Sequence, residues 1–384
     1  MTTPMKEPSV SVQLPSFATT VPDASQRADA AVGVGLAGAL LTKSRWMTTL
    51  GALAFVAIVI GIVSLHYGAQ PIAFTEILRL LVAALAMESG PDDVNDVTRT
   101  ILEQVRLPRV LLGFLVGCSL ASVGVVLQAL LRNPLADPYV LGVSSGAALG
   151  AAMGVLFGAG ATVLADAALP ACGFAGGLMA LGIVYRMAAD HERLSVHSLL
   201  LAGVILNAIF SALIMFITSI MEPNRAYGMT AWLMGAITAP TYGSLLGLAA
   251  YLGIGLFLLL GQVRVLNVLA LGEDSARALG VDTERTKRLM FVLAALVTGA
   301  VVSVSGMIGF IGMVVPHAVR LVVGADHRVL LPASALVGGT FLMGADTIAR
   351  TLLAPTEIPV GIITALTGGP FFIYLLLRRK DRLA

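Results

Sequence analysis

The chain has 384 residues, of which 57% are hydrophobic and only 12% charged, with 41 glycines and a formal net charge of +2. Soluble domains carry about 25% charged residues, so this composition is typical of a protein that crosses the membrane several times. No basic run is interleaved with aromatic residues, which argues against nucleic-acid binding. The two cysteines, Cys118 and Cys172, show no metal-site or disulfide spacing and are interpreted as small apolar fillers.

Residues 1–45 are rich in Thr, Ser, Pro and Ala and lack hydrophobic periodicity, so we expect a disordered tail. The apolar stretch 31–41 is too short to span a bilayer, which takes about 20 residues. No convincing cleavage site precedes the next apolar segment, and no removable signal is predicted. Residues 46–384 are expected to form one transmembrane domain.

Ten segments of this domain are long and apolar enough to be membrane spans. Backbone groups in lipid must be satisfied within the segment, so an all-α fold is predicted. The predicted spans are residues 46–67, 107–131, 143–163, 169–187, 199–220, 244–260, 288–304, 308–322, 330–351 and 361–377.

The distribution of Lys and Arg predicts the orientation of these spans. With the N-terminus inside, 18 of the 24 basic residues lie on the inner side. The positive-inside rule therefore favours both termini in the cytoplasm. The six basic residues left on the outer side are Arg79, Arg99, Arg106, Arg109, Arg225 and Arg350.

Two connections are long, an outer one at residues 68–106 and an inner one at residues 261–287. The inner one contains LGEDSARALGV at residues 271–281, a short helix-forming run with Glu273, Asp274 and Arg277. A charged helix between membrane spans does not pack against lipid. It is therefore expected to offer a surface to a soluble partner, as in a transporter driven by another polypeptide.

A stripe of glycines recurs every four residues at Gly142, Gly146, Gly150, Gly154 and Gly158. Close helix packing is the favoured interpretation, ahead of direct substrate contact.

The NPLADP segment at residues 133–138 links the second and third spans on the inner side. Its two prolines fix a turn. From the spacing alone, a rigid inner constriction with Asn133 and Leu135 at a translocation path and a simple tight turn are equally supported.

Three of the outer arginines, Arg106, Arg109 and Arg350, stand at the mouths of spans. They either snorkel to the interface or receive carboxylates of a soluble partner. Asp346 lies four residues before Arg350, and an ion pair within the helix is favoured over a functional intramembrane carboxylate. Gln128 and Asn207, polar residues inside spans, either face a pathway or make interhelical hydrogen bonds.

No Walker phosphate loop, HExxH motif or nucleophile elbow occurs, and the five histidines are scattered. We therefore predict no catalytic residue and no metal site. The chain is not expected to be an enzyme, and its energy must come from a concentration gradient or from another polypeptide. The spans hold almost no carboxylates, which argues against ion coupling, although a proton- or sodium-driven secondary transporter remains the alternative.

Together these residues resemble the FecCD-type permeases, the membrane subunits of ABC importers for cobalamin, haem and ferric siderophores. The resemblance runs in family order from about residue 46 to the C-terminus. The matching elements are RLPR at 106–109, NPLADP at 133–138, LGV at 141–143, LLAG at 200–203, LGE at 271–273, AR at 276–277, LG at 279–280, GFIG at 309–312, PH at 316–317, DHR at 326–328 and EIPVG at 357–361.

The resemblance implies a type II ABC-importer permease of ten helices in the bacterial inner (plasma) membrane. A second copy or a close paralogue would complete the pathway on a dimer axis. Two cytoplasmic ATPase subunits would hold the ATP and magnesium, with no cofactor in this chain. A periplasmic or lipid-anchored binding protein would dock on the outer side. A ferric siderophore is expected as the substrate because it is the broadest class in the family, with haem or cobalamin as alternatives.

The resemblance also assigns roles to single positions. Residues of a coupling segment at about 262–287 would seat in the ATPase: Leu271, Gly272, Glu273, Asp274, Ala276, Arg277, Leu279 and Gly280. Acidic residues of the binding protein would meet Arg106, Arg109 and Arg350. Asn133 and Leu135 would form one cytoplasmic gate, and Ser195 with His197 another. His197 departs from the small hydroxyl residues of the family at that position, as does the long N-terminal tail from the family's length.

Overall fold

The computed structural model describes residues 43–68, 70–86, 95–159, 165–190 and 193–380. The predicted N-terminal tail therefore lies outside the described residues as far as residue 42. The helices are α2 Lys43–His66, α3 Phe74–Ala86, α4 Asp96–Thr100, η1 Ile101–Arg106, α5 Leu107–Leu130, η2 Pro138–Leu141, α6 Val143–Leu156, α7 Ala165–Ala188, α8 Val196–Ile220, α9 Pro223–Leu233, α10 Tyr242–Gly261, α11 Val263–Leu269, α12 Glu273–Ala278, α13 Thr283–Ser305, α14 Ile311–Val323, α15 His327–Thr351 and α16 Val360–Lys380.

The predicted all-α fold is confirmed. Among the described residues, seven helical segments are long and apolar enough to cross a membrane: α2, α4 with η1 and α5, α7, α8, α10, α13 and α15. Three shorter apolar helices, α6, α14 and α16, match the remaining predicted spans. The strands of the described chain are a two-residue antiparallel pair, β1 Ala189–Asp190 and β2 Arg193–Leu194.

The predicted outer loop at residues 68–106 was wrong in part, because it contains α3, α4 and η1. Ile77 and Leu80 on α3 are buried, three residues apart on one helical face. They pack in a small core with Leu65 of α2 and Leu102 of η1. α3 is too short to span a membrane, and its amphipathic pattern contains no long apolar run that would mark it in the sequence.

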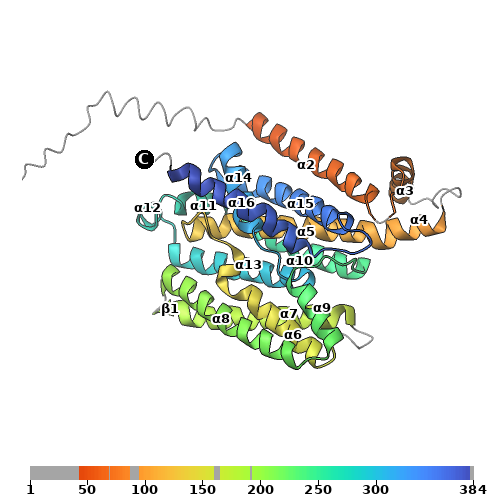
Figure 1. Ribbon diagram of the computed structural model, residues 1–384. Helices are drawn as coiled ribbons and strands as arrows, with labels where there is room; N and C mark the ends of the chain where they lie inside the picture. Colours follow the sequence, from red (N-terminus) through yellow and green to blue (C-terminus); the bar gives the residue numbers. More distant parts are fainter. Residues whose placement is uncertain (1–42, 69, 87–94, 160–164, 191–192, 381–384) are drawn as a thin grey trace, which may run out of the picture. The chain divides into compact units, whose positions relative to one another are not determined.

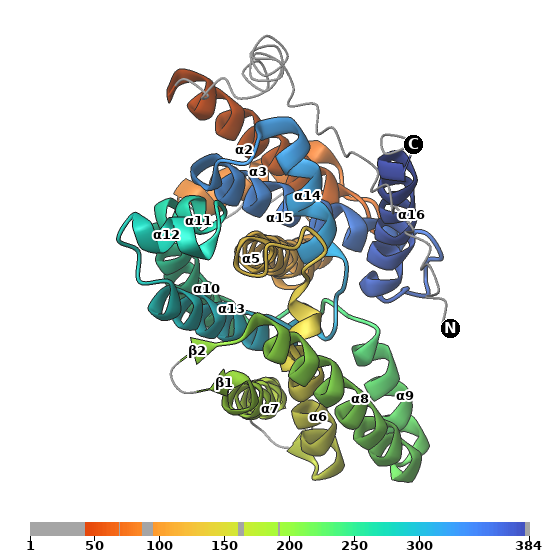
Figure 2. The same cartoon turned by 90° about the vertical axis from the view of Figure 1, so that its left-hand side faces the viewer.

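The core is organised around α5, which Figure 2 shows end-on near the centre, with α14 and α15 on one side and α10 and α13 on another. α5 is apolar on all faces. Of the residues in the most apolar part of its span, 83% are buried, against 17% for α2 at the periphery. Small residues allow the close packing. A Cβ on Gly117 would collide with the carbonyl group of Gly338 in α15, so the two backbones touch there.

The glycine stripe of α6 packs in the same way. A Cβ at Gly146 or Gly150 would collide with side-chain or backbone atoms of α7, including Gly176 and the carbonyl oxygen of Cys172. The packing interpretation of the stripe therefore holds at these two positions.

We expect Gly117→Ala to lower the free energy of unfolding by about 1–3 kcal/mol, because α15 must move to admit the methyl group. Thermal unfolding in detergent measures the effect. Gly51→Ala is the matched control, since nothing lies within 4 Å of a Cβ at that position on α2. Equal midpoints for the two variants would contradict the packing argument.

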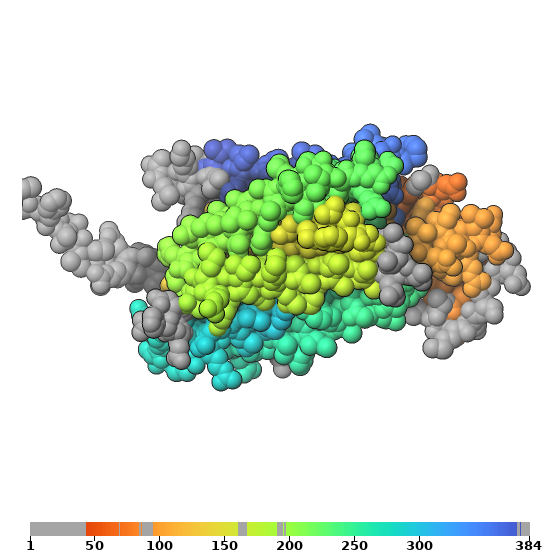
Figure 3. Space-filling model, turned by 90° about the horizontal axis from the view of Figure 1, so that it is seen from below, coloured from red at the N-terminus to blue at the C-terminus, as the bar shows by residue number. Residues whose placement is uncertain are grey.

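The two ends of the helical bundle differ. Figure 1 shows α12, β1 and the C-terminal end of α16 at one end and α3 and α4 at the other. These are called the α12 end and the α3 end below. Between them, Figure 3 shows the face formed by α7 and α8, two helices in contact. Along α8, Leu201, Val204, Met215 and Phe216 are exposed, as expected for a surface facing lipid or another subunit.

Candidate coupling, gate and docking sites

The segment around α12 projects two leucines from the end of the bundle. Gly272 and Gly280 flank α12 with φ angles of 116° and 81°, which glycine adopts without steric cost. Leu271 and Leu279, just beside these turns, are 69% and 65% exposed. Ala276, on the inner side of the short helix, is fully buried. The fold thus holds one face of α12 inward and leaves an apolar pair outside.

The charged residues of this segment bind to the chain itself. Glu273 accepts from Lys287 Nζ at 3.2 Å, and the same Nζ lies 2.7 Å from Glu284 Oε1. Arg277 lies 3.2 Å from Glu273 and 3.5 Å from Glu284. Lys287 is 4% exposed and is therefore a buried cation paired with two carboxylates. This charge cluster ties α12 to the first turns of α13.

A second tie joins α11 to the start of α15. Asn267 Nδ2 donates to Asp326 Oδ1 at 2.7 Å, and Asn267 Oδ1 accepts from the backbone N–H of His327 at 2.8 Å. Burial opposes the charged form of Asp326, but hydrogen bonds from the Arg328 backbone and Asn267 outweigh it and lower the pKa of the carboxyl. Movement of the α11–α12 segment would therefore pull on α15 as well as on α13.

Asn133 and Leu135 follow α5, which ends at the α12 end of the bundle. Asn133 Oδ1 accepts from the backbone N–H of Leu135 at 2.9 Å, which stabilises the turn, and Leu135 is 41% exposed. Asp137 then caps η2 by accepting from Tyr139 N–H at 2.9 Å. The tight turn is thus present, and a gate role for Asn133 and Leu135 stays a prediction.

Burial raises the pKa of Asp137 to about 6, against an opposing hydrogen bond from the Tyr139 backbone. Between these two values of pH, the folded state therefore keeps a proton on Asp137 that the unfolded state, with a pKa of about 3.9, has already lost. Stability from this group is present below the unfolded pKa and is lost as pH rises through about 6.

We expect Asp137→Asn to remove this loss, because asparagine also caps helices and stays neutral. Between pH 4 and pH 7 the unfolding midpoint of the parent should fall progressively below that of the variant. The cause is the raised pKa of Asp137, which makes the parent lose stability as the pH rises. Midpoints measured across that range check it, and a constant difference at every pH would contradict it.

The second predicted gate lies directly after β2. Ser195 is the N-cap of α8 and accepts from Ser198 N–H at 3.3 Å, and both Ser195 and His197 are exposed. Figure 1 places β1 at the α12 end. The structure therefore puts both predicted gate pairs at the same end as the coupling segment, while their gating role stays a prediction.

Two of the predicted docking arginines donate hydrogen bonds to the last carbonyls of α2. Arg106 donates to the carbonyls of Leu65 and His66 at 2.7 and 3.0 Å and also to that of Gln70. Arg350 donates to the carbonyl of Ser64. Carbonyls in the last turn of a helix lack partners and carry its negative end, so two cations stabilise them. Arg106 and Arg350 are 5% and 6% exposed. Sequence reasoning missed this structural role.

Arg109 connects α5 to two later segments. It donates to Asp346 of α15 at 3.0 Å through Nη2 and to Glu357 at 2.9 Å through Nη1. Asp346 is buried, whereas the side chain of Glu357 is 56% exposed. The favoured pair of Asp346 with Arg350 exists, but at 3.8 Å it is looser than the pair with Arg109. Of the three arginines, Arg109 is closest to solvent, and docking stays a prediction for all of them.

The polar residues inside the spans make interhelical hydrogen bonds. Gln128 donates to the carbonyl of Met313 at 3.0 Å, and Asn207 donates to that of Tyr139 at 2.9 Å. Within the described residues, no group of three His, Cys, Asp or Glu side chains is placed to hold a metal ion.

Comparison with known proteins accounts for this arrangement. The model of the FecCD transport family matches residues 52–378. The chain belongs to this family. The cobalamin import system permease protein BtuC of Halobacterium salinarum is 45% identical over 289 residues, covering 75% of this chain and 76% of that protein. The hemin transport system permease protein HmuU of Yersinia pestis is 38% identical over 335 residues, covering 87% and 96%.

A solved structure described as an inward-facing conformation of a metal-chelate type ABC transporter has a TM-score of 0.73 to this FecCD permease. It is 32% identical and covers 86% of this chain and 99% of its own. The predicted family is therefore confirmed. This FecCD permease is a multi-pass membrane subunit and not an enzyme, and an ABC importer of this kind needs a separate ATPase and a substrate-binding partner.

Proposed function

We propose that this chain is the pathway-forming subunit of an ATP-driven importer of a metal chelate. The exposed pair Leu271 and Leu279 is the observation that carries the proposal. Both leucines protrude into water outside the membrane spans, and a partner that covers them would lower the free energy of the system. A cytoplasmic ATPase dimer is the partner that family membership implies.

The mechanism follows from how the segment is tied. ATP binding in the partner moves α12, the charge cluster at Lys287 passes the shift to α13, and Asn267 passes it to α15. Both helices pack on the central α5. Close-packed helices respond as rigid bodies between discrete arrangements. ATP and magnesium belong to the ATPase, and this chain contributes no cofactor of its own.

The α12 end is cytoplasmic in this proposal, as the distribution of basic residues predicts. A second copy or a close paralogue would complete the pathway. Exposed apolar side chains along α8 support such a neighbour, since lipid or protein must cover them. Asn133 with Leu135 and Ser195 with His197 would narrow the cytoplasmic mouth. A periplasmic or lipid-anchored binding protein would approach the α3 end, where a partner carboxylate could compete with Glu357 for Arg109.

For the substrate, the names of the relatives give the order of testing. One is named for cobalamin and one for hemin, both of which hold a metal in a tetrapyrrole macrocycle. We therefore place cobalamin and haem first, and the ferric siderophore expected from the sequence third.

Affinity purification of the tagged chain from its native membrane in mild detergent, followed by mass spectrometry, tests the proposal. We expect an ABC ATPase and a binding protein to be recovered. Reconstituted with them in liposomes, the complex should take up one of the three chelates only with ATP. Uptake without ATP that collapses with an uncoupler would instead support the gradient-driven alternative.

A further inference from the structure

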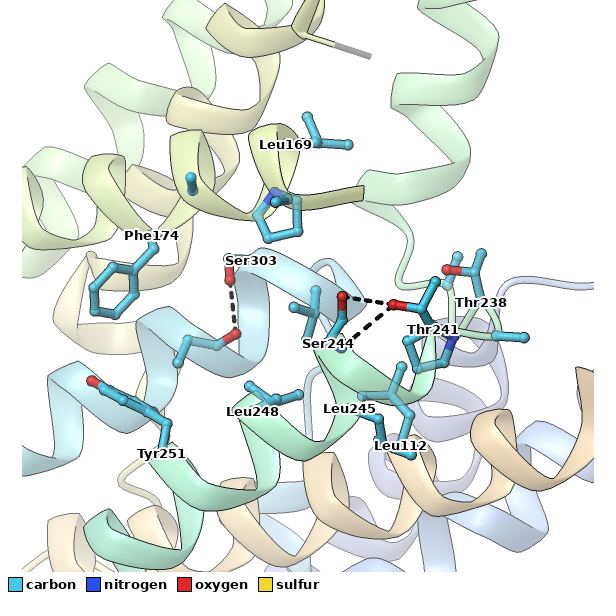
Figure 4. A pocket seen from close by; sticks show the side chains of 18 of the residues that line it. Leu112, Leu169, Phe174, Thr238, Thr241, Ser244, Leu245, Leu248, Tyr251 and Ser303 are labelled. Atoms are coloured by element: carbon cyan, nitrogen blue, oxygen red, sulfur yellow. Dashed lines mark hydrogen bonds between the residues drawn. The ribbon is translucent and has the colours of Figure 1, made fainter. Parts of the chain in front are cut away.

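A cavity of about 630 Å³ lies among α5, α7, α10 and α13, on the side of the bundle that α7 and α10 enclose. Figure 4 shows Phe174 and Leu169 of α7 facing Leu245 and Leu248 of α10 across it. The wall residues come from the N-terminal halves of α7 and α10 and the last turns of α13. The end of α9, the connection from α9 to α10 and Leu112 near the start of α5 complete the wall. The cavity therefore lies toward the α3 end of the spans.

Among the residues that the structure describes, the lining has no charged side chain: no Asp, Glu, Lys, Arg or His contributes to it, and most of its side chains are aliphatic or aromatic. Three of the lining hydroxyl groups donate hydrogen bonds within the chain. Thr241 Oγ1 donates to Ser244 Oγ at 3.0 Å, Ser303 donates to the Ala300 carbonyl at 2.8 Å, and Tyr251 donates to that of Leu296 at 3.4 Å. A ligand that needs several free hydrogen-bond partners finds few here.

The volume lies within the range of small-ligand sites, about 300–1,000 Å³. Ordered water needs two to four polar partners, and this lining offers few that are free. The occupant must therefore be apolar over most of its surface.

The cavity opens at the surface of the bundle between α7 and α10. Ala171 on α7 and Ser244 and Tyr251 on α10 are exposed while lining it. In the most apolar parts of α7 and α10, only 33% and 22% of the residues are buried, as expected for helices that border hydrocarbon. A chain of methylene groups can therefore enter sideways between the two helices without passing through water.

We propose that this cavity binds one acyl chain of a membrane phospholipid. The hydroxyl pair Thr241–Ser244 stands where α10 begins, at the polar edge of the span, and Phe174, Leu248 and Tyr251 line the deeper part. The polar head of the lipid lies at the hydroxyl pair, and its acyl chain lies along the aromatic and aliphatic side chains of the deeper part. Occupancy braces the start of α10 against α7.

The chain provides its own reporter, because only Trp46 and Trp232 occur and Trp232 lines the cavity. The full-length Trp46→Phe protein is placed in bilayer nanodiscs of dioleoylphosphatidylcholine containing increasing fractions of the dibrominated lipid, whose bromines quench tryptophan by contact. Because brominated and unbrominated chains compete for the cavity on equal terms, we expect quenching of Trp232 to rise with the bromolipid fraction. In pure bromolipid it should exceed the quenching that lipid outside the cavity causes, and this excess is called the cavity component. The Trp232→Phe protein, which reports from Trp46 on peripheral α2, measures quenching by lipid outside the cavity.

Ser244→Phe and Ala171→Phe fill the cavity from opposite walls and should each abolish the cavity component. Leu246→Phe is the matched control, since Leu246 lies two residues along α10, is 68% exposed and does not line the cavity. It should leave the component intact. Quenching of Trp232 that is as deep in both filled variants as in the unfilled protein would overturn the proposal. Using two fillers guards against one that disturbs folding.

Discussion

The double substitution Leu271→Asp with Leu279→Asp should abolish recovery of the ATPase and ATP-driven uptake, while the permease stays folded. Burying each leucine contributes about 1.5–3 kcal/mol, so losing both weakens the complex at least about 100-fold. Both side chains already face solvent in the chain alone, so aspartate costs little there. Co-purification with the ATPase and uptake into liposomes are the measurements.

The control is Leu352→Asp with Leu353→Asp, a pair of equally exposed leucines that follow the C-terminal end of α15. It should leave the ATPase bound. Reversing the charges of Glu273 and Arg277 is a poorer test, because it would also remove one of the two carboxylates paired with the buried Lys287 and put a like charge beside it. An ATPase that still binds the Leu271/Leu279 variant with parental affinity would place the coupling surface elsewhere.

Replacing Asp346 by alanine should destabilise the protein by about 3–5 kcal/mol, because it leaves the buried Arg350 and the partly buried Arg109 without their shared carboxylate. The pair joins α5 to α15 across 237 positions of sequence. Unfolding in detergent, followed by tryptophan fluorescence or light scattering, measures the loss.

Glu357→Gln is the matched control on the other side of Arg109. Its side chain is 56% exposed, and exposed ion pairs contribute only about 0–1 kcal/mol. Unfolding midpoints that drop equally for the two variants would show that burial does not decide the strength of these pairs.

Much of this protein is determined by local sequence. Each membrane span is a sum of side-chain hydropathies over about 20 neighbouring residues, so all ten predicted segments coincide with apolar helices. The family motifs are likewise contiguous, and they predicted membership that the match over residues 52–378 confirms. Short amphipathic α3 escaped because its buried face, with Ile77 and Leu80, becomes visible only when a neighbouring core receives it.

The positions of the charged side chains depend on tertiary packing. Arg106 caps the end of α2 from 41 positions away, and Arg350 caps it from 286. Likewise, Lys287 is buried between Glu273 and Glu284 while Leu271 and Leu279 are left outside. The spans, their predicted sidedness and the family follow from the sequence, because hydropathy and motifs act locally. Which cations are buried and which leucines are exposed depends on how separate helices pack, and no local pattern records it.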